Sequence, residues 1–218
     1  MTAAPPIAPN QPGDVLEHIA TGTQIIVPLA NGEPTALMDE IDAAAASGDP
    51  RIDKVCVHQM HAIHDRPYLR GSYGDRLHHL SYFLSHVTRP YFANGSIGLI
   101  PAHFSEVYAL MRMRTDDPLV IAAASPPDRH GYFSLGVSAD YTSSFIGRGR
   151  FFREVTDAMP RTFGRNQIHM SQVVGWCRSD RPLVDTPPAT PGDLDRQIAS
   201  LVAERIPDGA TIQTGIGA

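Results

Sequence analysis

The chain has 218 residues, of which 42% are hydrophobic and 19% charged, and its formal net charge is −5. This composition is typical of a soluble globular protein with one substantial core. The negative charge and the scattered arginines give no reason to expect nucleic acid as a partner. The sequence has no signal-peptide pattern and no apolar run of membrane-spanning length, and Cys56 and Cys177 form no C-x-x-C motif. We therefore expect a cytoplasmic protein without a disulfide framework.

Short apolar runs alternate with helical patterns between residues 24 and 125. The runs are of the kind that forms buried strands, whereas apolar side chains at three- and four-residue spacing predict helices. In chain order, we predict a strand at 24–29, a helix at 34–47, a strand at 54–60, a helix at 75–87, a strand at 95–101, a helix at 103–113 and a strand after Pro118.

This alternation predicts an α/β fold, with an open, mostly parallel sheet covered by helices on both faces. In such folds ligands gather at the carboxyl ends of the strands. Three loops whose residues could take part in chemistry are predicted at this edge, at 28–34, 58–76 and 125–136.

After Gly147 the pattern is looser. Residues 150–164 mix extended and turn signals, and 166–176 resemble one further strand. The segment that follows is rich in Pro, Asp, Thr and Ser, which is the composition of a linker. A new helix is then expected, with Thr190 as N-cap, Pro191 at the first position and Asp193 completing a capping box.

Leu194, Ile198, Leu201 and Val202 would form the apolar face of this helix, and a strand is predicted at 210–214. One helix and one strand bury too little apolar area to form a domain alone. They either dock onto the first domain or begin a second α/β domain, and we favour the second. The predicted domains are 1–177, a linker at 178–192, and 193–218 as the start of an incomplete catalytic domain.

Three histidines, His58, His61 and His64, are spaced three residues apart. On one helix face they would suggest zinc, for which imidazole is a common ligand. Their segment has a strand pattern instead, in which residues three apart point to opposite faces. We therefore favour loop histidines that shape a pocket, and keep a histidine-based metalloprotein as a weaker alternative.

The segment "SPPDRHGYFSLG" directly follows the most apolar predicted strand. Ser125, Asp128 and His130 invite comparison with a hydrolase triad, yet three members within six residues do not normally align as nucleophile, base and orienter. Prolines, Asp128 and Gly131 are residues that build a turn held by its own hydrogen bonds. A self-supporting turn is the favoured interpretation.

The terminal "TGIGA" carries Gly215 and Gly217, which allow backbone amides to approach a ligand closely. Two glycines alone are a weak nucleotide-binding signal. If a helix followed them, its amino end would favour an anion or a developing negative charge.

Four segments, "GLIPAHFSEV", "SPPDRHGYFSLG", "MPRTFG" and "PDGATIQTGIGA", occur in the order found in the acetyl-CoA hydrolase/transferase family, which this chain resembles from about Gln24 to Ala218. The resemblance implies two related open α/β domains with the active site between them. It also implies transfer of CoA between carboxylic acids through a glutamyl-CoA thioester, in which a glutamate attacks the acyl-CoA. Short carboxylic acids and acyl-CoA would be the substrates, no separate cofactor would be needed, and the full-length enzyme would be a homo-oligomer.

The resemblance places the nucleophilic glutamate beyond residue 218, and Glu204 on the predicted helix does not take its place. Thr156 and Asp157 also replace the asparagine-containing version that precedes "MPRT" in the family. We expect a fragment that is inactive alone, with Gln213, Gly215 and Gly217 lining the cleft and the loop from Ser125 to Gly131 facing them. The alternative is a non-catalytic module that binds acyl-CoA or is complemented by a partner chain.

Overall fold

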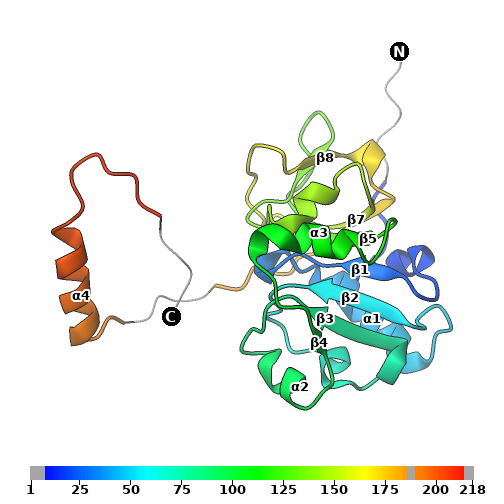
Figure 1. Ribbon diagram of the computed structural model, residues 1–218. Helices are drawn as coiled ribbons and strands as arrows, with labels where there is room; N and C mark the ends of the chain where they lie inside the picture. Colours follow the sequence, from blue (N-terminus) through cyan, green and yellow to red (C-terminus); the bar gives the residue numbers. More distant parts are fainter. Residues whose placement is uncertain (1–7, 186–189, 214–218) are drawn as a thin grey trace. The chain divides into compact units, whose positions relative to one another are not determined.

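The computed structural model describes residues 8–185 and 190–213 (Figure 1). The chain divides into two compact units, 1–183 and 184–218, and the division lies inside the segment predicted as a linker. No helix in the described ranges has the length and apolar character that crossing a bilayer requires.

The first unit is built on a seven-stranded sheet in the order β4-β3-β2-β1-β5-β7-β9 (Figure 1). Every pairing in this sheet is parallel, which confirms the predicted fold class. A small antiparallel sheet pairs two further strands, β6 and β8. The strands are β1 (Gln24–Ile26), β2 (Val55–Gln59), β3 (Leu77–Ser81), β4 (Gly98–Leu99), β5 (Leu119–Ala124), β6 (Tyr132–Ser134), β7 (Arg150–Val155), β8 (Gln167–His169) and β9 (Gly175–Arg178).

Helices cover both faces of the large sheet. The α-helices of this unit are α1 (Thr35–Ser47), α2 (Arg89–Ala93) and α3 (Val107–Arg112), joined by 3₁₀ turns η1 (Pro12–His18), η2 (Ala30–Gly32), η3 (Pro67–Arg70), η4 (Gly74–Arg76), η5 (Phe104–Glu106), η6 (Tyr141–Phe145) and η7 (Met170–Gln172). Successive strand residues point to opposite faces. Ile25 and Phe152 therefore pack in the cluster that contains α1, whereas Ile26 and Phe151 pack in the cluster that contains α3.

One predicted helix is wrong, because residues 77–81 of the segment 75–87 form the strand β3. The leucines at 77, 80 and 84 match a helical spacing, but periodicity alone does not separate a short buried strand from a helix. The β2 strand decides the outcome, since β3 pairs with it along its whole length. The segment 166–176 also differs from the prediction, because η7 separates β8 from the start of β9.

The second unit contains α4 (Asp193–Ala203). This helix begins at Asp193 and not at Pro191, because Gly192 is the N-cap and its N–H donates to Asp195 Oδ2 over 2.8 Å. The described part of the strand predicted at 210–214 has no β-structure. A strand needs a neighbour to receive its backbone hydrogen bonds, and the described residues of this unit offer none.

Candidate functional site

The β1 and β5 strands mark the point where the sheet reverses its order. From β1 the chain moves outward through β2, β3 and β4, and then returns to add β5, β7 and β9 on the other side of β1. Loops that leave neighbouring strands in opposite directions open a crevice at the carboxyl edge, which is where open α/β sheets bind ligands. The three loops predicted for this edge leave β1, β2 and β5, so the structure brings them to one side of the sheet.

The loop after β1 is held in a strained and crowded conformation. Ala30 has φ of 47°, a left-handed value that costs energy in a residue other than glycine. Its N–H donates to the His61 carbonyl over 3.0 Å, which ties the loop to the one after β2. A Cβ on Gly32 would lie 2.5 Å from the Cβ atoms of Pro28 and Ser138, so no larger residue fits there. The surrounding structure therefore fixes the path of this loop.

The buried side chains of Asp140 and Tyr141 hydrogen-bond to the backbone at the start of the same loop. Asp140 Oδ2 accepts the Leu29 N–H at 2.8 Å, and its Oδ1 accepts from both the N–H and the hydroxyl of Thr142. Burial raises the pKa of Asp140 to about 6. The Tyr141 hydroxyl donates to the Val27 carbonyl at 2.6 Å, and burial raises the pKa of this phenol well above its usual value.

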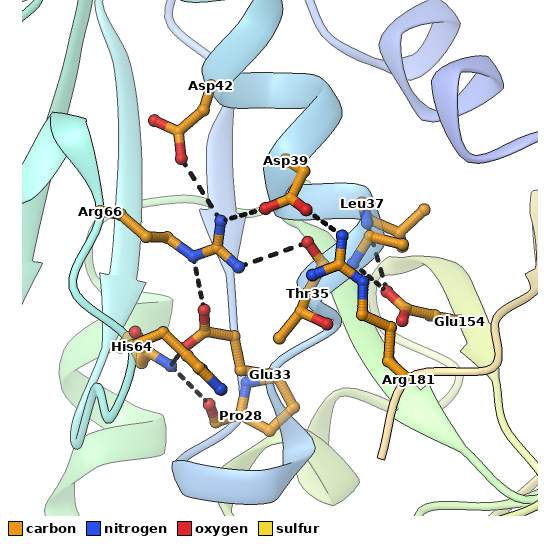
Figure 2. Close-up of polar contacts among 12 residues, drawn as sticks. Pro28, Glu33, Thr35, Leu37, Asp39, Asp42, His64, Arg66, Glu154 and Arg181 are labelled. Atoms are coloured by element: carbon orange, nitrogen blue, oxygen red, sulfur yellow. Dashed lines mark hydrogen bonds and ion pairs between the residues drawn. The ribbon is translucent and has the colours of Figure 1, made fainter. Parts of the chain in front are cut away.

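Glu33 is the centre of a buried charge cluster at this edge (Figure 2). Its carboxylate accepts from Arg66 Nε at 2.7 Å and from Gln59 Nε2 at 3.1 Å, and His64 Nδ1 lies 3.3 Å from Oε2. Burial raises the pKa of Glu33, but the contacts with His64 and Arg66 outweigh burial and hold it below its ordinary value. Glu33 is therefore an ionised structural anchor.

Arg66 extends the cluster to α1. Its Nη1 contacts Asp39 at 2.8 Å and Asp42 at 3.4 Å, and its Nη2 donates to the Thr35 carbonyl at 3.3 Å (Figure 2). Arg181, in the segment after β9, pairs with the other oxygen of Asp39. The first turns of α1 are thus joined to the loop after β2 and to the segment after β9, which lie on opposite sides of the point where the sheet reverses its order.

Glu154 holds the amino end of α1. It lies on β7, and its Oε2 accepts the N–H groups of Ala36 at 2.8 Å and Leu37 at 3.2 Å (Figure 2). These amides have no partner within the helix, and a negative charge is favourable beside them. Burial raises the pKa of Glu154. Glu33 and Glu154 are thus both engaged in positioning the first turns of α1 and the loop before it.

The loop after β5 is a turn held by its own hydrogen bonds, as predicted. Ser125 N–H donates to the Ser134 carbonyl at 2.9 Å, and the buried Ser125 hydroxyl accepts from Ser134 N–H at 3.2 Å. Asp128 Oδ1 accepts the backbone N–H groups of His130 and Tyr132, while its Oδ2 pairs with Arg161 at 2.9 Å. Asp128 therefore binds the His130 backbone and not its imidazole, and no triad forms.

Gly131 allows this turn to close against β8. Its φ is 82°, and a Cβ there would lie 3.0 Å from Nε2 of His169. Ser125 and Gly131 thus lie on the expected loop at the carboxyl edge. Gln213 is exposed and belongs to the second unit, and Gly215 and Gly217 lie outside the described residues. Substrate binding by these five residues stays a prediction.

The three spaced histidines have separate partners. His58 places its two nitrogens 3.0 Å from the Tyr82 hydroxyl and 2.8 Å from Gln24 Oε1, and burial lowers its pKa to about 4. His61 packs on Phe83 with ring centroids 5.6 Å apart, and His64 faces Glu33. No group of three His, Cys, Asp or Glu side chains within the described ranges has the arrangement of a metal site.

The anchors of this edge, Glu33, Arg66, Asp140 and Glu154, were not predicted from the sequence. One signal was present, because Glu154 follows two phenylalanines within a strand pattern and a charge in such a place needs a partner. No local spacing identifies its partner, since α1 lies more than a hundred residues earlier in the chain.

Comparison with known proteins gives a consistent result. Residues 10–186 match the acetyl-CoA hydrolase/transferase N-terminal domain. The 4-hydroxybutyrate coenzyme A transferase of Clostridium kluyveri is 32% identical over 205 residues, which are 93% of this chain and 47% of that protein. The succinyl-CoA:cyclohexane-1-carboxylate CoA transferase of Geobacter metallireducens is 29% identical, over 94% of this chain and 46% of that protein.

Solved structures agree with the sequence relatives. RipA from Yersinia pestis superposes with a TM-score of 0.87 at 29% identity, covering 95% of this chain and 50% of its own. A 4-hydroxybutyrate CoA-transferase from Porphyromonas gingivalis gives a TM-score of 0.75 at 25% identity, covering 97% of this chain and 48% of its own. The chain spans about half the length of these relatives. It belongs to the acetyl-CoA hydrolase/transferase family, and most of it matches the N-terminal domain of that family.

Proposed function

We propose that this chain forms the N-terminal half of an enzyme that transfers CoA from an acyl-CoA to a short carboxylic acid, or that hydrolyses the acyl-CoA to the acid and free CoA. The family match over residues 10–186 is the observation that carries the proposal. The constrained loops at the switch point support it, because they form a rigid wall at the edge where an α/β sheet binds its ligand. CoA is a substrate in this proposal, and no further cofactor is needed.

The proposed chemistry is covalent catalysis by a glutamate. Its carboxylate attacks the thioester carbonyl, the C–S bond breaks, and CoA leaves as a thiolate. The glutamate and the acyl group remain joined as a mixed anhydride. The thiolate then attacks the glutamyl carbonyl, which releases the first acid and leaves a glutamyl-CoA thioester for the second acid or water. Each step exchanges one acyl bond for another, so no oxidant or reductant is required.

The attacking glutamate belongs to sequence outside this chain in the proposal. Glu33 is paired with Arg66, and Glu154 accepts two amides of α1, so both carboxylates at the site already have structural partners. The role assigned to this chain is positioning. Its loops at 28–34 and 125–136 hold backbone groups beside the reacting thioester and limit the access of water.

The substrate class is also part of the proposal. The names of the relatives specify 4-hydroxybutyrate and cyclohexane-1-carboxylate, which differ in size and polarity. For this enzyme we propose short carboxylic acids as acceptors, a cytoplasmic location and a homo-oligomeric full-length form.

An exchange assay tests the proposal. Acetyl-CoA is mixed with a panel of short carboxylic acids, and both new CoA thioesters and free CoA released by hydrolysis are measured after adding either the 218-residue chain or the product of the whole reading frame that encodes it. We expect turnover from the whole product and none from the chain alone. Turnover by the chain alone would overturn the external glutamate, and an inactive whole product would overturn the proposed function.

A further inference from the structure

A hollow lies in the first unit, between α3, η6 and the start of β8. Its volume is about 570 Å³, and its polar lining consists of Tyr108, Ser143, Ser144, Arg148, Arg165 and Gln167. The lining includes two arginines and no aspartate or glutamate. The charge of this lining is therefore positive, whereas the formal net charge of the chain is −5.

The guanidinium of Arg148 is held in place at this hollow. Its Nη1 donates to the Tyr108 hydroxyl at 3.0 Å. The Tyr108 ring packs edge-on against Phe145 with centroids 4.8 Å apart, and Phe145 is fully buried. Because the Tyr108 oxygen accepts this bond, its own proton stays available for a ligand. The core thus orients both the cation and a neighbouring hydroxyl.

The two arginines of the hollow differ from most other arginines of the first unit in their ion pairs. Most ion pairs of the first unit involve arginines, for example Arg51 with Asp49, Arg70 with Asp65 and Arg161 with Asp128. Within the described part of the chain, neither Arg148 nor Arg165 pairs with a carboxylate. Two guanidinium groups without a carboxylate partner, on a lining that also offers hydroxyl and amide groups, are suited to an anion.

We propose that this hollow binds a phosphate group, with Arg148 and Arg165 as its principal donors. The planar guanidinium matches phosphate geometry through paired N–H···O bonds. The volume lies within the range of small-molecule sites, so the hollow accepts a phosphate ester as well as the free ion. The lining residues belong to neither the loop after β1 nor the loop after β5, although Gln167 pairs with Ser134 of the second loop. Phosphate binding here does not depend on the proposed transferase activity.

Isothermal titration calorimetry of the 218-residue chain with inorganic phosphate, at constant ionic strength, tests the site. We expect saturable binding whose Kd rises about tenfold in Arg148→Gln and in Arg165→Gln, since each removes a charged hydrogen-bond donor. Arg148→Lys keeps the charge but loses the planar pair of N–H donors of the guanidinium, so its Kd should lie between those of wild type and Arg148→Gln. Circular dichroism verifies that each variant is folded.

The matched control is Arg51→Gln, which removes the same charge from a surface that does not line the hollow. Its Kd should equal that of wild type. Absence of saturable phosphate binding, or an equal loss of affinity in the control, would overturn the proposal.

Two further ligands identify the source of the phosphate. If the group comes from CoA, CoA should bind more tightly than dephospho-CoA, which lacks the 3′-phosphate, and Arg148→Gln should remove this difference. If the ligand is free phosphate, CoA and dephospho-CoA should compete with it equally weakly. Both results support a phosphate site, and neither depends on CoA exchange.

Discussion

The helices α1 and α4 are both amphipathic in sequence, yet they differ in what covers their apolar faces. Leu37 and Ile41 of α1 are fully buried against the sheet, whereas Leu194 and Leu201 of α4 are 68% and 56% exposed. The first turns of α1 are also bound by Arg66 from the loop after β2 and by Glu154 from the strand β7. At the amino end of α4, the contact between Gly192 and Asp195 is local.

The difference shows that an apolar stripe predicts a helix but does not provide the surface that stabilises it. Most of the stability of a helix in a protein comes from packing of its apolar face, and isolated helices of this length are marginal in water. We therefore expect α1 to unfold together with the sheet, and the face of α4 to require a partner surface. In the proposed full-length enzyme that surface is the rest of the catalytic domain.

The largest loss of stability is expected when the buried cation that anchors α1 is removed. Arg66→Met leaves Glu33 ionised without its main partner, and we expect a loss of about 3–5 kcal/mol in the free energy of unfolding. The measurement is urea denaturation monitored by fluorescence of Trp176, the single tryptophan. Arg196→Met removes an exposed pair of α4 and should change this value by less than about 0.5 kcal/mol. Equal losses in the two variants would contradict the comparison.

Apolar truncation compares the two faces directly. Ile41→Ala should destabilise the first unit by about 2–5 kcal/mol, because it leaves a cavity in a fully buried site. Leu201→Ala should cost less than about 0.5 kcal/mol, since the side chain is exposed. Thermal denaturation of both variants gives the values. A large cost at Leu201 would show that its face is covered in solution.

The pH dependence of stability tests how Asp140 holds the loop that precedes α1. Asp140 has a folded pKa of about 6 against a reference value of 3.8, so the native state binds more protons between these values. Its contribution to stability is complete below the reference value and is lost as the pH rises through about 6. The difference in unfolding free energy between wild type and Asp140→Asn should therefore decrease by up to about 3 kcal/mol from pH 4 to pH 7.5. A difference that is constant with pH would contradict the raised pKa.

The smallest expected effect concerns the end of α1. Glu154→Leu removes the acceptor for the Ala36 and Leu37 amides and should cost about 1 kcal/mol. Hydrogen exchange should show faster exchange at these two amides and an unchanged pattern in α4. If the amides keep their protection, Glu154 is not the group that caps them.

Much of the fold follows from local pattern. The strands β1, β2 and β5 are short apolar runs buried on both faces, and α1 combines a regular apolar stripe with a terminating Gly48, so each was predictable. The strand β3 was not, because its leucines fit two periods and only pairing with β2 distinguishes them.

The candidate site was predicted in position but not in its contacts. The loops after β1 and β5 follow from the alternation of strands and helices, whereas the anchors at Glu33 and Glu154 depend on residues far away in sequence. The start of α4 was misplaced by two residues because Thr190, Gly192 and Asp193 all resemble capping residues. The hydrogen bond between Gly192 and Asp195 is what selects the start.

Intact-mass spectrometry of this chain after incubation with acetyl-CoA tests the central claim most directly, namely that its own glutamates position the site and do not attack the thioester. We expect an unmodified mass, because Glu33 is held by Arg66 and Glu154 by the amino end of α1. A covalent CoA adduct mapped to either glutamate would contradict it.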